Sequence, residues 1–174
     1  MSKSLVIDCE TTGLLLPSVS DLNDQPRIIE FGAVVIQDGD VVQRYNQLIN
    51  PGFDIETVIT KITGITNDDL KGKPKFPEVA DEIYAMFEGA EMVIAHNVEF
   101  DSTMVHNEFK RLGRSIDFPD LICTVQEFYH VYGRRMKLPE LYRHFLKKEL
   151  KQTHRAIDDV EALVEILQHI KYWS

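Results

Sequence analysis

Apolar residues first gather in the run Leu5–Ile7, which is short and typical of a buried strand. The segment 27–37 is rich in β-branched residues and also predicts a strand. An Asp-Gly-Asp turn at 38–40 and the segment 41–49 that follows predict a hairpin with a returning strand. The first third of the chain is therefore expected to contribute three strands, the second and third of them antiparallel.

The remaining two thirds alternate between helical and strand patterns. In the helical segments apolar residues recur every three or four positions, and Asn67 and Asn97 are expected to cap the helices beside them. The expected helices are 77–88, 98–112, 126–132, 138–146 and 154–170, with a short one after Asn67, and the expected strands are 92–95 and 121–124. This order predicts an α/β protein. No repeat or low-complexity tract divides it, so we expect a single domain, 1–174.

Composition and charge narrow the class of protein. Hydrophobic residues make up 44% and charged residues 27% of the 174 residues, as in ordinary soluble globular proteins. No apolar run approaches the roughly 20 residues of a membrane helix. Two cysteines indicate a cytoplasmic protein rather than a disulfide scaffold, and a bacterial or phage-infected cell would suit the small, unadorned domain. The net charge of −9 argues against a protein that coats nucleic acid. It still allows an enzyme that meets nucleic acid through bound metal ions, which supply local positive charge.

The first strand ends in two acidic residues, Asp8 and Glu10, on either side of Cys9. Side chains alternate between the faces of a strand, so the two carboxylates share one face, roughly 6.5–7 Å apart along the backbone, and Cys9 takes the other face. Two ionised carboxylates on one face need a counter-charge. Because hard cations prefer oxygen ligands, the pair predicts a divalent metal site at the strand end.

Two expected helices supply further carboxylates. Asp101 lies in the apolar stripe of helix 98–112, where a carboxylate is costly unless it is paired or bound to a metal. In helix 154–170, Asp158 lies about 180° from the centre of the apolar stripe, whereas Asp159 lies beside the stripe. Helix geometry therefore selects Asp159 as the inward carboxylate and predicts that Asp158 is solvated.

These residues form a candidate set with a defined chemistry. Four carboxylates from one strand and two helices suit a pair of Mg²⁺ or Mn²⁺ ions, and two ions about 3.5–4 Å apart can clamp the attacking and leaving oxygens of a phosphodiester. His154, just before the last helix, can take a proton from the attacking water if it is neutral near pH 7. Taken singly, an isolated Asp-x-Glu is most often a structural pair, and a lone histidine before a helix is most often a surface residue.

Three motifs contain these residues, and together they resemble the DnaQ-like, DEDDh-type 3′→5′ exonucleases, among them the proofreading exonuclease subunit of bacterial DNA polymerase III. Asp-x-Glu-Thr-Thr-Gly matches 8–13, His-Asn-x-x-Phe-Asp matches 96–101, and His-x-Ala-x-x-Asp matches 154–159. Their order and spacing match as well, over nearly the whole chain. The resemblance implies an RNase H-like fold, with a five-stranded mixed sheet flanked by helices.

The resemblance also implies roles for single residues. Two divalent metal ions, Mg²⁺ or Mn²⁺, would be held by the four carboxylates, and His154 would be the general base. The metal ligands would be Asp8, Glu10, Asp101 and Asp159. Residues in and beside the first two motifs would hold the 3′-terminal nucleotide. These are Thr11, Thr12, Leu14, Asn97 and Phe100.

The activity that the resemblance implies is hydrolysis from a free 3′ end with release of nucleoside 5′-monophosphates. We expect single-stranded DNA to be preferred over RNA, in a proofreading role, alone or with a DNA polymerase or other replication proteins. An exoribonuclease that trims RNA ends would use the same chemistry, because discrimination by the 2′-OH depends on local packing. A non-catalytic nuclease-like binding domain is a third alternative, and the presence of all four carboxylates and the histidine argues against it.

Two departures from the family pattern concern the substrate. Many members have a His-Gly-Ile-Thr segment where this chain has Thr63-Gly64-Ile65-Thr66, so that histidine is missing. The polar loop Leu14–Pro26 is longer than the corresponding link in many members, and we predict that it borders the substrate channel.

Two basic segments allow more than one interpretation. The loop Lys71–Lys75 is favoured as a solvated linker, with phosphate contact as the alternative. The turn Gly133–Arg135, flanked by Tyr129 and Tyr132, is favoured as part of a partly packed surface helix. Stacking and phosphate contact along a single strand is the alternative there.

Overall fold

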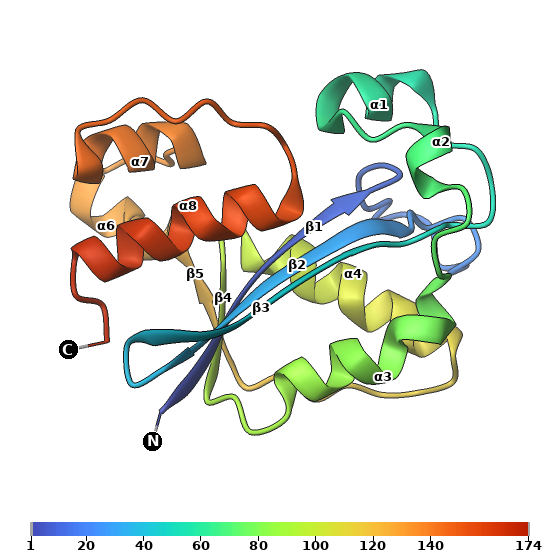
Figure 1. The fold of residues 1–174 in the computed structure, drawn as a ribbon, viewed down its shortest axis with the longest axis horizontal. Helices are drawn as coiled ribbons and strands as arrows, with labels where there is room; N and C mark the ends of the chain where they lie inside the picture. Colours follow the sequence, from blue (N-terminus) through green and yellow to red (C-terminus); the bar gives the residue numbers. More distant parts are fainter. Residues whose placement is uncertain (1, 174) are drawn as a thin grey trace.

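A computed structural model describes residues 2–173 and has a five-stranded mixed sheet at its centre (Figure 1). The strands are β1 (Lys3–Thr11), β2 (Ile28–Gln37), β3 (Asp40–Leu48), β4 (Met92–Ala95) and β5 (Asp120–Cys123). Their order in the sheet is β3-β2-β1-β4-β5. The pairs β1–β2 and β2–β3 are antiparallel, whereas β1–β4 and β4–β5 are parallel. The expected mixed sheet is confirmed. Four of the five predicted strand ranges begin and end within one residue of the observed strand, and β1 extends beyond the predicted apolar run Leu5–Ile7 at both ends.

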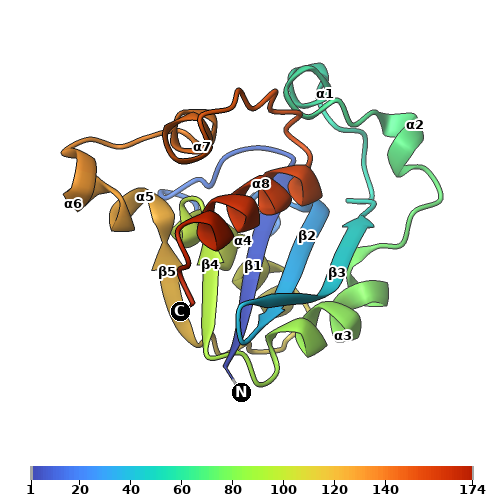
Figure 2. The ribbon, with the colours of Figure 1, turned by 60° about the vertical axis from the view of Figure 1, so that its left-hand side comes forward.

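Helices cover both faces of this sheet (Figure 2). They are α1 (Thr57–Thr63), α2 (Asn67–Leu70), α3 (Phe76–Phe87), α4 (Val98–Arg111), α5 (Thr124–Glu127), α6 (Tyr129–Tyr132), α7 (Leu138–Leu146) and α8 (Ala156–His169). α3 and α4 form one apolar core with the sheet, and α7 and α8 form another on the opposite face. Among residues 2–173, no helix is long and apolar enough to cross a membrane.

β1 lies in the middle of the sheet and divides its side chains between the two cores. Ile7 and Cys9 belong to the core under α3 and α4, whereas Val6 belongs to the core under α8. Asp8 and Glu10 continue the face of Val6, because side chains alternate along a strand. The expected separation of Cys9 from the two carboxylates is therefore confirmed.

Helix α1 is the element that the sequence pattern did not predict. Six of its seven residues are β-branched, in the sequence TVITKIT. Such residues lose side-chain freedom in a helix and favour strands, so their local preference conceals the helical turn. Gly64, with φ of 72°, ends the helix in the left-handed conformation.

Of the two predicted asparagine caps, Asn97 does occupy the N-cap position of α4, whereas Asn67 is not the cap of α2. Asn97 has φ of 81° and makes no side-chain capping bond, because the chain turns there in the left-handed conformation that asparagine tolerates. Thr66, rather than Asn67, caps α2 by accepting a bond from the Asp69 N–H, and the Asn67 Oδ1 instead accepts from the Ile55 N–H. The single helix expected over 126–132 is divided into α5 and α6.

Candidate active site

Asp8 and Glu10 lie at the C-terminal end of β1, on the side of the sheet that α8 covers. In the pairing with β2, Asp8 lies opposite Gly32 and Glu10 lies opposite Glu30. The pairing shifts between Glu10 and Thr11. This irregularity ends the regular ladder beside the two carboxylates, at the kind of position where bulges re-aim side chains near active sites.

Asp101 joins this strand end from the opposite face of the sheet. It lies in the first turn of α4 and is 3% exposed. Its Oδ1 accepts a hydrogen bond from the Cys9 N–H at 2.9 Å. This bond fixes α4 to β1 at the residue between Asp8 and Glu10, so the buried carboxylate expected from the helix pattern has a defined partner.

α8 contributes Asp159, as the helix geometry predicted. Asp159 is 8% exposed, whereas Asp158 is exposed and accepts a hydrogen bond from the Thr153 hydroxyl at 2.7 Å. The Gln152 side-chain amide donates to Asp159 Oδ2 at 2.6 Å. Gln152 was not predicted from the sequence, since a polar residue in a loop carries no distinctive pattern.

His154 lies on the exposed loop that precedes α8. Its φ of 52° is in the left-handed region, which is uncommon for a residue with a side chain. Candidate ligand atoms of Glu10, His154 and Asp159 all lie within 4.8 Å of one another. The histidine is therefore in contact range of the carboxylates while remaining open to solvent.

A buried ion pair attaches the start of α8 to β2. Glu30 is fully buried and accepts bonds from Arg155 Nε at 2.9 Å, from an Arg155 terminal nitrogen at 2.7 Å and from the Ala156 N–H at 3.0 Å. Arg155 directly follows His154, so this fork fixes the backbone beside the histidine. The available signal in the sequence was a single carboxylate inside the apolar segment 27–37, which was not singled out.

Gly32 lets the same helix end approach the sheet. A Cβ at this position would lie 2.7 Å from the Ala156 carbonyl carbon and 2.7 Å from the Ile157 nitrogen. Both are backbone atoms, which cannot move aside without moving the helix. The absence of a side chain at Gly32 therefore sets how closely α8 packs over β2.

Burial raises the pKa of every carboxyl group in the cluster. It raises the pKa of Asp8 well above its ordinary value, and the charges of Asp101 and Glu10 add to the effect. Burial, followed by the charge of Asp159, raises the pKa of Glu10 to about 8. Burial also raises the pKa of Asp101 to about 7 and is the main cause of the raised pKa of Asp159. The four carboxyl groups therefore lack enough nearby positive charge to be ionised together.

The donor chemistry of the cluster fits divalent cations. Arg155 lies close enough to lower the pKa of Glu10, but its guanidinium is bonded to Glu30. The remaining donors are carboxylate oxygens beside one imidazole, and hard divalent cations prefer oxygen ligands. A cation at this strand end would offset both the burial and the mutual repulsion of the carboxylates.

The residues expected to hold the terminal nucleotide lie at the end of β1, in the turn that follows and at the start of α4. The hydroxyls of the two threonines among them are bonded to nearby backbone atoms. The Thr11 hydroxyl donates to the Gly13 carbonyl at 2.7 Å, and the Thr12 hydroxyl accepts from the Arg27 N–H at 3.0 Å. The Leu14 side chain is 78% exposed. Both threonines therefore shape the turn after β1, and Leu14 is available for contact.

The loop 14–26 and α4 together line a groove of about 500 Å³. Asn97 and Phe100 of the second motif form part of its wall, and Leu15, Leu16 and Pro17 face them from the loop. We call this the loop groove. The long loop therefore lies beside the second motif, and its bordering of a substrate channel stays a prediction.

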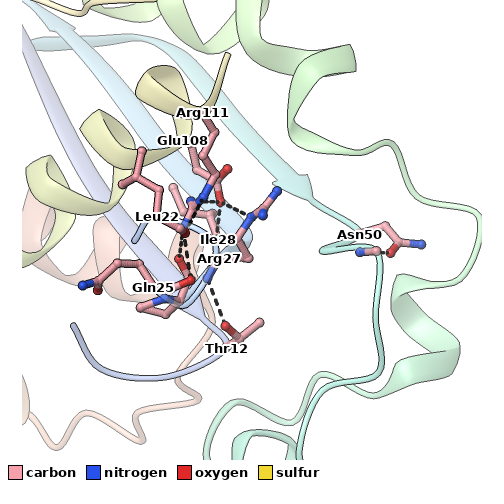
Figure 3. A network of polar contacts seen from close by, with 10 residues as sticks. Thr12, Leu22, Gln25, Arg27, Ile28, Asn50, Glu108 and Arg111 are labelled. Carbon is pink, nitrogen blue, oxygen red and sulfur yellow. Dashed lines mark hydrogen bonds and ion pairs between the residues drawn. The ribbon is translucent and has the colours of Figure 1, made fainter. Parts of the chain in front are cut away.

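A polar network holds this loop against α4 (Figure 3). Arg111 donates to the carbonyls of Leu22, Gln25 and Pro26 at 2.7–3.1 Å. Arg111 also pairs with the buried Glu108 at 3.1 Å, and Glu108 accepts from the Ile28 N–H at 3.1 Å. Because buried backbone carbonyls need partners, these bonds order a loop that has no regular structure of its own.

Four carboxylates and a histidine at the end of a central strand, in this mixed sheet, define a class of nucleases that depend on divalent metal ions. The family model described as "Exonuclease" (RNase_T) matches residues 5–167. The chain therefore belongs to this exonuclease family and is a nuclease, a hydrolase of phosphodiester bonds.

Curated relatives are about one-third identical to the chain. A PolC-type DNA polymerase III of Caldanaerobacter subterraneus subsp. tengcongensis is 34% identical over 164 residues, which cover 93% of this chain and 11% of that protein. The 3′-5′ exonuclease DinG of Bacillus subtilis is 34% identical over 173 residues, which cover 96% of this chain and 18% of that protein. The chain thus spans between a tenth and a fifth of the length of these two relatives.

Solved structures confirm the expected RNase H-like fold. Exonuclease X in complex with 5′ overhanging duplex DNA aligns with a TM-score of 0.67 and 26% identity, covering 94% of this chain and 90% of that one. The zinc-bound E. coli ExoI–ssDNA complex aligns with a TM-score of 0.81 and 19% identity, covering 99% and 41%. The nuclease domain of 3′hExo, described as a DEDDh family member, aligns with a TM-score of 0.76 and 16% identity, covering 98% and 92%. The chain therefore shares the fold of these nucleases, in agreement with its match to the exonuclease family model.

Proposed function

We propose that this chain is a 3′→5′ exonuclease that removes nucleotides from the 3′ end of single-stranded DNA and releases 5′-mononucleotides. The observation that carries the proposal is the convergence of all four motif carboxylates and His154 at one end of β1, from β1, α4, α8 and the loop before α8. The one-third identity to DNA polymerase III and to a protein named 3′-5′ exonuclease supports the polarity and the preference for DNA.

Asp8, Glu10, Asp101 and Asp159 would hold two divalent ions, Mg²⁺ or Mn²⁺. Such ions, when bound, neutralise the phosphate and lower the pKa of an attacking water. The chain's own contribution is a set of oxygen donors whose positions the core fixes, above all through the Cys9–Asp101 bond. Gln152 orients Asp159 by donating to the oxygen Oδ2.

His154 would act as the general base. It would take a proton from the attacking water at an imidazole nitrogen and return it to solvent, to which the loop is open. Its neighbour Arg155 holds the backbone through Glu30, so that the ring stays beside Glu10 and Asp159.

The 3′-terminal nucleotide would bind between the turn after β1 and the start of α4. Leu14 would offer its exposed apolar surface to the terminal base, and Phe100 and Asn97 would contact the nucleotide from the wall of the loop groove. Thr11 and Thr12 would contribute mainly by holding this turn in shape, because their hydroxyls are bonded within it. A DNA polymerase or another replication protein is the partner class that we propose, since the matched polymerases contain this domain as part of a longer chain.

Degradation of end-labelled nucleic acids tests the proposal. Single- and double-stranded DNA and RNA, labelled at the 5′ or the 3′ end, would be incubated with Mg²⁺, Mn²⁺ or EDTA. We expect 5′-labelled single-stranded DNA to shorten stepwise, 3′-labelled DNA to release its label at once, and EDTA to stop both. Faster degradation of RNA than of DNA would identify RNA, rather than DNA, as the preferred substrate. Shortening from the 5′ end would overturn the proposed polarity.

A further inference from the structure

A second groove, of about 560 Å³, is lined by His154 and shares Asn97 with the loop groove. Its wall contains His96 and Asn97 from the end of β4, Gln152 and His154 from the loop before α8, and the segment 135–138. We call it the basic groove. It is continuous with the carboxylate cluster, because Gln152 is bonded to Asp159 and His154 lies within 4.8 Å of Glu10 and Asp159.

Two cations, Arg135 and Lys137, form one side of the basic groove. Both side chains are exposed, and within residues 2–173 neither has an ion pair or a side-chain hydrogen bond. The neighbouring Arg134 differs, because it pairs with Glu140 at 3.1 Å. Glu140 also lines the groove, but its carboxylate is bonded to Arg134 and to the Lys137 N–H. The free charge of the groove is therefore positive in a protein whose net charge is −9.

The backbone that carries these cations is anchored. Met136 and Leu138 are 8% and 3% exposed and belong to the core under α8. Alternation with these buried residues turns Arg135 and Lys137 outward together. In an extended segment, residues two apart are separated by about 6.5–7 Å, which is close to the spacing of successive phosphates in an extended single strand. Arg135 also lies near the half-buried His96, whose pKa is lowered by burial and further by this guanidinium.

The aromatic neighbour Tyr132 is packed within the protein, unlike Arg135 and Lys137. Tyr132 packs its ring against His144 at 4.3 Å and against Phe145 at 6.1 Å, so it belongs to the packing of α7. The interpretation as a partly packed surface helix thus describes Tyr132. It does not account for Arg135 and Lys137, which make no ion pair or side-chain hydrogen bond in the described part of the chain.

We infer that Arg135 and Lys137 bind the phosphates of the DNA strand immediately 5′ of the scissile bond. This is the part of the substrate upstream of the terminal nucleotide. The inference rests on the proposed exonuclease function. Asn97 lines both grooves. With the terminal nucleotide beside Leu14 and Phe100, the rest of the strand passes His154 and enters the basic groove.

The chemical step does not use these cations. They act on binding, because each phosphate that they neutralise releases a condensed counterion from the strand. Their contribution therefore depends on the length of the substrate and on the salt concentration. A contribution confined to the reacting phosphate would not depend on the length of the substrate.

The test compares two substrates of the double variant Arg135→Gln/Lys137→Gln. One is 5′-labelled oligothymidylate of about 12 nucleotides. The other is the p-nitrophenyl ester of thymidine 5′-monophosphate, which has a terminal nucleotide but no upstream strand. We expect kcat/KM for the oligonucleotide to fall at least tenfold at low salt and kcat/KM for the ester to change less than twofold. The slope of log(kcat/KM) against log[salt] for the oligonucleotide should become shallower by about 1.4, from two contacts at about 0.7 each.

The matched control is Arg143→Gln/Lys148→Gln, which removes the same charge from exposed ion pairs outside both grooves. It should leave both substrates and the salt slope unchanged. An equal fall for ester and oligonucleotide, an unchanged salt slope, or an equal effect of the control would overturn the inference while the exonuclease function stands. A wild-type protein that hydrolyses neither substrate with Mn²⁺ would overturn the proposed function and the inference with it.

Discussion

The carboxylate side and the histidine side of the site differ in how the fold holds them. Asp101 is buried and bonded to the main chain of β1, and Asp8 lies on the central strand of the sheet. His154 is exposed, lies in a loop and has a left-handed backbone conformation. The positions of the carboxylates thus come from the core, whereas the position of the histidine depends on the attachment of α8 through Glu30 and Gly32.

The largest expected effect separates two adjacent aspartates on the carboxylate side. Asp159→Ala should reduce exonuclease activity to background, because it removes a donor from the buried cluster. Asp158→Ala should change the rate less than twofold, since its side chain is exposed and bonded only to Thr153 in the described contacts. Rates on a 5′-labelled oligonucleotide compare the two, and the opposite ranking would falsify the choice of Asp159 as the ligand.

On the histidine side, His154→Ala should lower kcat by about 10²–10⁴-fold, the usual contribution of a general base. Mn²⁺ affinity, measured by calorimetry, should persist within a few-fold because the carboxylates remain. If Mn²⁺ binding is lost together with activity, His154 is a metal ligand rather than a base, which its closeness to Glu10 and Asp159 also permits.

Glu30→Ala tests the attachment that links the two sides. It would leave Arg155 and the Ala156 N–H without their acceptor. Breaking a buried pair costs about 3–5 kcal/mol, and the partial exposure of Arg155 reduces this to about 2–3 kcal/mol. The exposed pair of Arg44 with Glu161 is the control, and Glu161→Ala should cost at most about 1 kcal/mol. Urea unfolding that gives equal losses for the two variants would contradict this ranking.

The raised pKa values predict how pH acts on the carboxylate side. The pKa values of Glu10 and Asp101, about 8 and about 7, exceed their ordinary values of 4.5 and 3.8, so the folded protein binds protons that the unfolded chain has released. Between about pH 4 and 8, the metal-free protein should therefore lose stability as pH rises.

Bound metal should reverse this loss, because it requires deprotonated ligands. Thermal unfolding with EDTA or Mn²⁺ should show a larger Mn²⁺-induced rise in Tm at pH 8 than at pH 6, at about 2–4 °C for each 1 kcal/mol. An equal rise at both pH values would show that the ligands are already deprotonated at pH 6.

The smallest effect on stability is expected at the loop groove. Deletion of Pro17–Asn23 removes the groove wall and one Arg111 acceptor, Leu22, but leaves the acceptors Gln25 and Pro26. We expect a change of several-fold in the preference between oligonucleotides with different 3′-terminal bases, and little change in Tm. Equal loss of folding and activity would show that the loop is structural only.

The sequence predicted the parts of the site that follow from periodicity. Asp159 and Asp101 could be placed because apolar residues define the buried faces of α8 and α4, and the alternation of β1 placed Asp8 and Glu10 together. The strands could be predicted because they are rich in β-branched residues and because turns mark their limits.

The parts that periodicity does not encode were missed. α1 was missed because its β-branched residues oppose its helical conformation. Asn67 was wrongly predicted as a cap because it bonds to Ile55 across a loop. Asn97 does precede α4 as its N-cap residue, but its left-handed conformation comes without a side-chain capping bond. Glu30 and Arg111 depend on partners more than 80 residues away, which local patterns cannot show.

A substitution at Gly32 is expected to inactivate the enzyme, although this residue has no side chain with which to bind nucleic acid or metal ions. A single added methyl group would press on the backbone of Ala156 and Ile157 and displace the first turn of α8. Asp159 and the residues leading to His154 would move together, away from carboxylates that β1 and α4 hold in place. Such a protein would keep its complete set of catalytic residues and still lose activity, because the added group would push the start of α8 away from the face of the sheet that carries Asp8 and Glu10.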